Sequence, residues 1–214
     1  MLVKEDPLVI ELDHPLVHAA LAELRHKDTP VPRFRQRARE LARYLILEAT
    51  KDFDTDEIEI ETPLAKTKGR TLGDRPIVLA PILRAGLVMV EPALALLPEA
   101  HVHHIGLYRN EQTLEPVQYY VKLPEKFHPE TRLMVVDPML ATGGSAVATI
   151  DLFKSRGITK IKFLCLIAAP QGVENVRTHH PDVPVYAVAI DSHLNEQGYI
   201  VPGLGDAGDR IFGT

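Results

Sequence analysis

The stretch that decides the fold is Leu133-Met-Val-Val-Asp-Pro-Met-Leu-Ala-Thr-Gly-Gly-Ser145. Its first four residues are apolar, which predicts a short strand buried on both faces of a sheet. Pro138 ends this strand, because proline removes a backbone donor and restricts the residue before it. A small-residue turn then leads into a helical pattern near Val147. A strand, a small-residue turn and a helix start together predict a cradle for a phosphate, formed by free backbone N–H groups and the positive helix end.

Polar side chains around this turn fit a ligand that carries a sugar as well as a phosphate. Thr142 and Ser145 supply hydroxyl donors, and Asp137 at the strand end can accept hydrogen bonds from sugar hydroxyls. A nucleoside-triphosphatase loop would need a lysine after its last glycine, where Ser145 stands. From this stretch alone, an ordinary strand, turn and helix without a ligand stays the alternative.

Composition predicts one globular domain of 214 residues, with 45% hydrophobic and 25% charged residues. The net charge of −5 and the lack of a polybasic block argue against sequence-independent nucleic-acid binding. No apolar run reaches membrane-spanning length, and the first residues lack a signal-peptide pattern. The single cysteine, Cys165, excludes an internal disulfide. We therefore expect a cytoplasmic protein that binds neither nucleic acid nor membrane.

Apolar runs alternate with helical patterns, which predicts an α/β fold with a central, mainly parallel sheet flanked by helices. The expected strands of the core are Ile77–Ile82, Val102–Tyr108, Leu133–Val136, Ile161–Ala169 and Val183–Ile190. We expect a single domain, 1–214, made of N-terminal helices (14–50), a core (76–191) and a glycine-rich tail (192–214).

Shorter segments add local predictions. Asp13 can cap the first helix, and a second helix is expected from Arg33 to Thr50 after a break at Thr29–Pro32. The arginines of its outer face, Arg33 to Arg39, are interpreted as a solvated, salt-bridged surface, with an effector patch as the alternative. Lys66–Arg70 is expected to form a basic turn.

Two further stretches point to ligand binding. Arg84 follows a buried strand and precedes a glycine at a helix start, where open α/β sheets bind ligands, and it can grip a diphosphate bidentately. The tail Tyr199–Thr214 holds four glycines, which predicts irregular backbone close to a ligand. Its match to the dinucleotide fingerprint is taken as spurious, because no helix is expected to follow. Exposed main-chain groups there could pair with a flat base that has alternating donors and acceptors.

The stretch Asp137–Ser145 resembles the ribose-phosphate signature of type I phosphoribosyltransferases, in the version found in uracil phosphoribosyltransferases. Most members of the wider family carry two adjacent acidic residues where this chain has Asp137-Pro138. Ile82–Gly86 resembles the family's diphosphate loop. Tyr108-Arg109-Asn110 followed by Thr113–Pro116 resembles its flexible hood, and Tyr199–Thr214 resembles its uracil-recognition segment.

The resemblance implies transfer of a 5-phosphoribosyl group from phosphoribosyl diphosphate to uracil. It implies four catalytic residues: Arg84, Arg109, Asp137 and Asp206. The implied donor-binding residues are Arg84, Arg109, Asp137, Pro138, Met139, Leu140, Ala141, Thr142, Gly143, Gly144, Ser145 and Asp206. The implied uracil-binding residues are Ile200, Gly205, Asp206 and Ala207.

The resemblance also implies magnesium, held mainly by the diphosphate and water rather than by protein ligands. GTP is a candidate activator, and the family's habit is a homodimer or homotetramer. Two rivals stay open: a regulatory protein that keeps this fold but binds RNA, and an enzyme that acts on orotate or a purine. The net negative charge and the tail argue against both.

Overall fold

The computed structural model describes residues 6–109 and 116–214, and for Tyr108, Arg109 and Pro116 it describes the backbone alone. The helices are α1 (Pro15–Arg25), α2 (Val31–Ala49), a 3₁₀ helix (Ala85–Met89), α3 (Val90–Leu96), α4 (Gly144–Lys154), α5 (Pro170–His179) and α6 (Ala207–Phe212). The strands are β1 (Val9–Glu11), β2 (Asp56–Glu61), β3 (Lys66–Thr71), β4 (Ile77–Leu83), β5 (His101–Val102), β6 (Ile105–Arg109), β7 (Pro116–Val121), β8 (Arg132–Val136), β9 (Met139–Leu140), β10 (Lys160–Ala168), β11 (Val185–Ile190), β12 (His193–Leu194) and β13 (Ile200–Val201).

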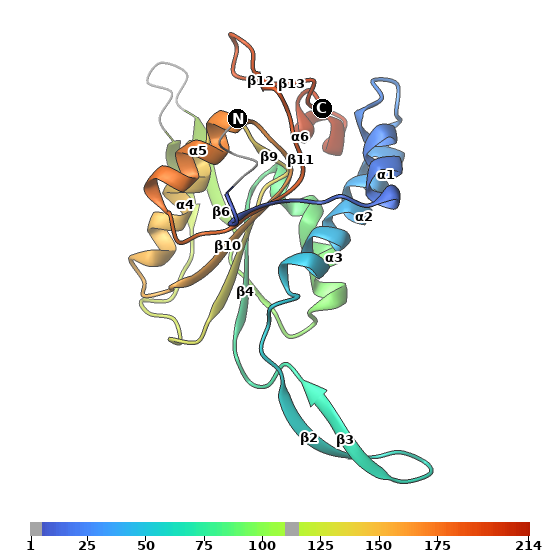
Figure 1. Ribbon diagram of the computed structural model, residues 1–214. Coiled ribbons are helices and arrows are strands. Elements are labelled where there is room, and N and C mark those ends of the chain that lie inside the picture. Colours follow the sequence, from blue (N-terminus) through green and yellow to red (C-terminus); the bar gives the residue numbers. More distant parts are fainter. Residues whose placement is uncertain (1–5, 110–115) are drawn as a thin grey trace.

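The central sheet has the strand order β1-β11-β10-β8-β4-β6-β7, with β5 and β9 as short additions. The pairs of the sheet are parallel except that between β6 and β7. Helices α1, α2 and α3 cover one face and α4 and α5 cover the other (Figure 1). The predicted fold class, an α/β fold with a mainly parallel sheet between helices, is confirmed.

Two apolar layers fill the space between the sheet and its helices. One layer packs α2 and its neighbours against the sheet and includes the fully buried Leu41. The other packs α4 and α5 against the opposite face and includes Phe153. The middle strand β8 is therefore apolar and buried from Leu133 to Val136, as predicted.

A two-stranded hairpin of β2 and β3 projects away from the body (Figure 1). A strand is present at Glu57–Glu61 as predicted, but these residues are exposed on both faces and not half-exposed, and the prediction of a basic turn at Lys66–Arg70 is wrong. The lysines and arginine of that segment alternate along β3 and stand opposite the glutamates of β2, as in the pair between Lys68 and Glu57 at 2.7 Å. Cross-strand pairing therefore turns a polar sequence into a strand.

Helix boundaries differ slightly from the predicted ones. The side chain of His14, not Asp13, caps α1 by accepting a hydrogen bond from the backbone N–H of Leu16 at 3.1 Å. Helix α2 begins at Val31, because proline in the first turn needs no hydrogen-bond donor. For the same reason α5 begins at Pro170.

The arginines on the outer face of α2 form ion pairs. Arg33 and Arg37 both contact Glu23 of α1, and Arg39 lies 3.1 Å from Glu91 of α3. The interpretation of this face as a salt-bridged surface is therefore confirmed for these three residues.

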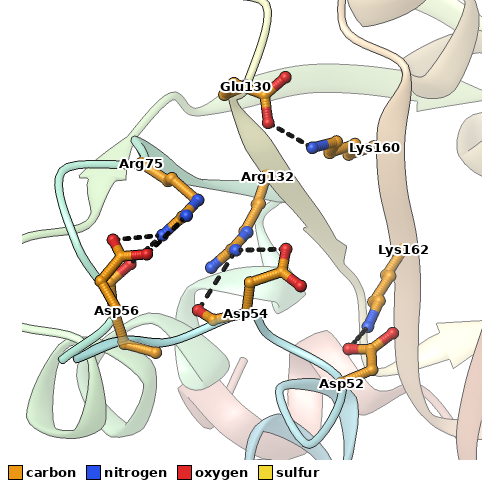
Figure 2. Close-up of polar contacts among 9 residues, drawn as sticks. Asp52, Asp54, Asp56, Arg75, Glu130, Arg132, Lys160 and Lys162 are labelled. Carbon is orange, nitrogen blue, oxygen red and sulfur yellow. Dashed lines mark hydrogen bonds and ion pairs between the residues drawn. The ribbon is translucent and has the colours of Figure 1, made fainter. Parts of the chain in front are cut away.

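At the amino-terminal end of the parallel strands, charged pairs fasten the segment that joins α2 to β2 (Figure 2). Arg132, nearly buried, lies 3.2 Å from Asp54, and its guanidinium stacks 4.5 Å from the ring centre of Phe53. Lys162 of β10 pairs with Asp52. Ion pairs thus surround this end of the sheet, where they border a small cleft of about 260 Å³, and a larger cleft lies at the opposite end. Within the described ranges, no helix combines the length and apolar character that crossing a membrane requires.

The packing of α2 predicts unequal effects for two leucines of that helix. Leu41→Ala should lower the free energy of unfolding by about 2–5 kcal/mol, because it leaves a cavity in the core. The control Leu47→Ala, at a side chain that is 65% exposed, should change it by roughly 0.5 kcal/mol or less. Urea unfolding measures both, and equal losses would contradict the packing described for α2.

Candidate functional site

The predicted phosphate cradle lies at the carboxyl end of β8. Gly143 precedes α4 with a left-handed φ of +82°, and a side chain there would meet the carbonyl of Gly172 at 2.8 Å. Helix α4 begins at Gly144, so its free N–H groups face the turn. A phosphate bound at this helix start would meet both those donors and the positive end of the helix dipole.

Helix α5 holds the cradle from behind. The side-chain amide of Asn175 donates to the carbonyl of Thr142 at 2.8 Å. Gly172 packs so closely that an added Cβ would lie 2.7 Å from the carbonyl oxygen of Leu140. The backbone N–H of Ala169 donates to that same carbonyl at 2.9 Å. These contacts fix the backbone of the turn without using the groups that would face a phosphate.

Asp137 directly follows β8 and borders the cleft. Its carboxylate accepts one hydrogen bond, from the backbone N–H of Met139 at 3.3 Å. Desolvation by burial raises the pKa of Asp137 to about 7, and the hydrogen bond from Met139 opposes this shift only in part. The carboxyl group can therefore accept sugar hydroxyls when it is ionised, at a cost in desolvation that a bound ligand would offset.

Arg84 stands at the end of β4, on the neighbouring strand of the same edge. Its side chain is 61% exposed and lies 3.6 Å from the carboxylate of Asp209 in α6. Its guanidinium is also 5.8 Å from the ring centre of Phe212. Gly86 lets this loop approach β8, because a Cβ there would lie 2.7 Å from the carbonyl oxygen of Val136. Arg84 thus borders the cleft with its guanidinium largely exposed to solvent.

The tail is more ordered than its glycine content predicted. It forms the small antiparallel pair of β12 and β13 and then helix α6. The expectation that no helix follows the tail glycines is wrong: Asp206 caps α6 by accepting from the backbone N–H of Asp209 at 2.9 Å. An aspartate before a short apolar segment is an ordinary helix-capping signal, and it could have been found in the sequence.

The segment that leads into the cradle, the arginine loop and the tail line one open cleft of about 640 Å³, whereas Thr142–Ser145 of the cradle are not among its lining residues. Of the predicted site residues, Arg84, Asp137, Met139, Ala141, Ile200, Gly205, Asp206 and Ala207 border it. Pro138 and Leu140 are buried behind the lining, and Thr142–Ser145 form the start of α4. The side chain of Arg109, and residues 110–115 of the expected hood, lie outside the described part of the chain.

Other residues of the lining escaped the sequence reasoning. Ala85, Gln197, Gly198, Tyr199 and Gly208 also border the cleft. Tyr199 and Gly208 belong to the tail Tyr199–Thr214, which was expected to bind a ligand, but the sequence did not show that these two residues face the cleft. Gln197 and Gly198 form a polar turn between two very short strands, and such a turn carries no signal for a site.

The carboxylates that border the cleft suit a metal ion that binds together with a phosphate-containing ligand. Asp137 and Asp206 both border the cleft. Among the residues that the structure describes, no three histidine, cysteine, aspartate or glutamate side chains are grouped closely enough to hold a metal by themselves. Magnesium commonly binds through one or two carboxylates together with phosphate oxygens and water, and the two aspartates fit that pattern.

Comparison with known proteins agrees with this geometry. A family model described as uracil phosphoribosyltransferase matches residues 11–214. The uracil phosphoribosyltransferase of Dictyoglomus thermophilum is 54% identical over 97% of this chain and 100% of its own length. That of Geobacillus kaustophilus is 53% identical over 96% of this chain and 98% of its own.

Solved structures share the fold. The AQ2163 protein of Aquifex aeolicus superposes with a TM-score of 0.89 at 38% identity, covering 95% of this chain and 97% of that one. Adenine phosphoribosyl transferase from Trypanosoma brucei superposes with a TM-score of 0.60 at 15% identity, over 92% of this chain and 90% of that one, which shows a shared fold alone. Together with the match of the family model over nearly the whole chain, these findings show that the chain belongs to the uracil phosphoribosyltransferase family.

Proposed function

We propose that the cleft transfers a 5-phosphoribosyl group from phosphoribosyl diphosphate to N1 of uracil, giving UMP and diphosphate. The observation that carries this proposal is that a single cleft is bordered by the residues that lead into a phosphate-type turn, by an aspartate at a strand end and by a backbone-rich tail. Each of the three matches one part of the reactants: the 5′-phosphate, the ribose hydroxyls and the base. Membership in the uracil phosphoribosyltransferase family supports the same assignment.

The donor would bind along the β8–α4 turn. The residues from Asp137 to Ser145 would hold the 5′-phosphate with backbone N–H groups and hydroxyls, and Asp137 would accept the ribose hydroxyls. Arg84 would contact the diphosphate from the neighbouring strand, and Arg109 would join it from the end of β6. Both guanidiniums can bind phosphate oxygens bidentately.

The base would bind against the tail. Ile200, Gly205 and Ala207 would meet the edge of uracil through backbone groups, and Asp206 would lie between base and donor. A set of fixed N–H and C=O groups discriminates between bases by their donor and acceptor pattern, because an unmatched buried group loses its hydrogen bond.

The chemistry consists of one substitution at the anomeric carbon. The bond from C1 of the ribose to the diphosphate oxygen breaks, a bond from C1 to N1 of uracil forms, and the N1 proton is released. Bond breaking should run ahead of bond making, so positive charge develops on the ribose and negative charge on the diphosphate. The residues of the cleft would act by holding the reactants in line and by placing Arg84 and Arg109 at the leaving group.

Magnesium is the proposed cofactor, with Asp137 and Asp206 as the nearest protein carboxylates and with most ligands supplied by the diphosphate and water. When bound, it supplies positive charge to the diphosphate oxygens. Activation by GTP, assembly into a homodimer or homotetramer, and a cytoplasmic location stay predictions of the sequence.

The direct test is UMP formation from uracil and phosphoribosyl diphosphate with magnesium, with orotate and hypoxanthine as competing bases and with or without GTP. We expect turnover of uracil alone. Donor binding without turnover of any base would overturn the proposal and favour a regulatory protein, and turnover of another base would reassign the tail.

Arg84→Ala should lower kcat much more than it weakens uracil binding, by roughly 100-fold or more, because it removes charge stabilisation from the leaving group. Steady-state kinetics with each substrate varied separately measure this. Arg39→Ala is the matched control, since Arg39 is also a partly exposed arginine in an ion pair and lies on the outer face of α2. Unchanged kcat in Arg84→Ala would refute the role given to Arg84.

The raised pKa of Asp137 predicts a pH dependence of donor use. Below a pH of about 7 the carboxyl group is protonated, and it then accepts hydroxyl hydrogen bonds less strongly. We expect kcat/KM for the donor to fall as the pH drops below about 7, and Asp137→Asn to lower kcat/KM and flatten this limb. A limb that persists in Asp137→Asn would assign the titration to another group.

The same shift predicts a pH-dependent stability. Because the folded protein holds the Asp137 proton more tightly than the unfolded chain, stability should fall as the pH rises from the unfolded value near 4 to about 7, and then level off. Three pKa units correspond to about 4 kcal/mol. Asp137→Asn, which cannot ionise, should therefore gain stability relative to the original chain at pH 8 but not at pH 4 in urea unfolding. The same difference at both pH values would contradict the raised pKa.

A further inference from the structure

The last turn of α1 lies against the segment that precedes α6, although the two are far apart in sequence. Arg25, the final residue of α1, donates from its two Nη atoms to the carboxylate of Asp191 at 2.8 and 2.6 Å. Asp191 follows β11, and its side chain is only 5% exposed, against 23% for Arg25. A bidentate pair with this little solvent is geometrically specific.

This ion pair holds both backbone polar groups of Gly203. The N–H of Gly203 donates to the Asp191 carboxylate at 2.7 Å, and its carbonyl accepts from Arg25 at 3.0 Å. Gly203 has a left-handed φ of +60°, and any side chain there would collide with the carbonyl of Ile200. The turn after β13 is thus packed against the carbonyl of Ile200 in its own backbone, and it is hydrogen-bonded to the ion pair of Arg25 and Asp191.

A second arginine, which belongs to the tail itself, contacts the same end of α1. Arg210 of α6 donates to the carbonyl of His26 at 2.6 Å and to the carbonyl of Leu204 at 2.9 Å. Its guanidinium also stacks 4.2 Å from the ring centre of Phe34 in α2. Arg25 and Asp191 therefore hold the backbone of Gly203, and Arg210 holds the carbonyl of the next residue, Leu204.

Gly203 and Leu204 lie between the two segments of the tail that border the cleft. Ile200 precedes them and Gly205–Ala207 follow them. Neither Arg25 nor Asp191 belongs to the described lining of the cleft. A shift of the turn at Gly203 would move Ile200 and Gly205–Ala207 relative to a bound base. Their backbone hydrogen bonds to the base would then weaken, because hydrogen bonds weaken steeply when their geometry is lost.

We propose that Arg25 and Asp191 form a positioning pair that sets the backbone of the base-binding tail and thereby the affinity for uracil. The inference rests on the proposed function, since it assumes that the base binds against residues 200–207. Loss of one partner would leave the other charge in a desolvated place without its counterion. The turn at Gly203 would then lose one of its two side-chain hydrogen bonds directly, and the partner that makes the other would no longer be held in place.

The kinetic test uses Arg25→Met and Arg25→Lys beside the control Arg37→Met. Arg37 matches Arg25 in exposure, 22% against 23%, and also pairs with a carboxylate at the α1–α2 interface, but it lies away from the tail. In Arg25→Met the KM for uracil should rise roughly 10-fold or more, while the KM for phosphoribosyl diphosphate changes by less than about 2-fold. Arg25→Lys keeps the charge but not the bidentate guanidinium, so its KM for uracil should lie between that of the original chain and that of Arg25→Met. This variant should fold even if Arg25→Met does not. Arg37→Met should leave both constants unchanged.

A second readout does not depend on activity. Hydrogen exchange of the peptide 199–208 should be faster in the Arg25 variants than in the original chain and unchanged in Arg37→Met. Parallel rises in both KM values, or equal effects of Arg25→Met and Arg37→Met, would overturn the positioning role. If the original chain formed no UMP, the proposed function would fail, and the exchange rates would still decide whether the pair positions the tail.

Discussion

The site depends on one constraint, the complete enclosure of strand β8. This strand pairs with β4 on one side and with β10 on the other, and its residues are buried on both faces. Its backbone groups and side chains have no room to shift, so only its two ends can carry polar chemistry. At one end Arg132 joins the ion pairs that close the sheet, and at the other Asp137 borders the cleft.

Each helical layer has a separate task at this cleft. On one face, α5 fixes the phosphate-type turn through Asn175 and the close approach of Gly172. On the other face, α1 fixes the tail through Arg25 and through the carbonyl of His26. The elements proposed to hold the donor and the base are thus supported independently, and they face each other across the carboxyl edge of the sheet (Figure 1).

Burial and charge oppose each other at the centre of the cleft. The site needs an acceptor for sugar hydroxyls, yet the enclosure that positions Asp137 also raises its pKa to about 7. Arg84 has the opposite environment, since it is largely exposed and contacts Asp209 at 3.6 Å. The carboxylate is therefore costly to ionise, whereas the guanidinium is in contact with solvent. A desolvated carboxyl group for the sugar and an exposed arginine for the leaving diphosphate suit the proposed transfer.

The sequence alone predicted a mainly parallel sheet between helices, the core strands along the chain, and most of the residues that border the cleft. Apolar runs and the Asp137–Ser145 turn are local signals, because periodicity and proline act over a few residues. Tertiary structure decided the rest. The β3 strand pairs with β2, so its polar sequence becomes a strand through a partner outside it, and the pKa of Asp137 is raised by burial in the folded chain. The pairing of Arg25 with Asp191 joins residues 166 positions apart, and no local pattern encodes such a contact.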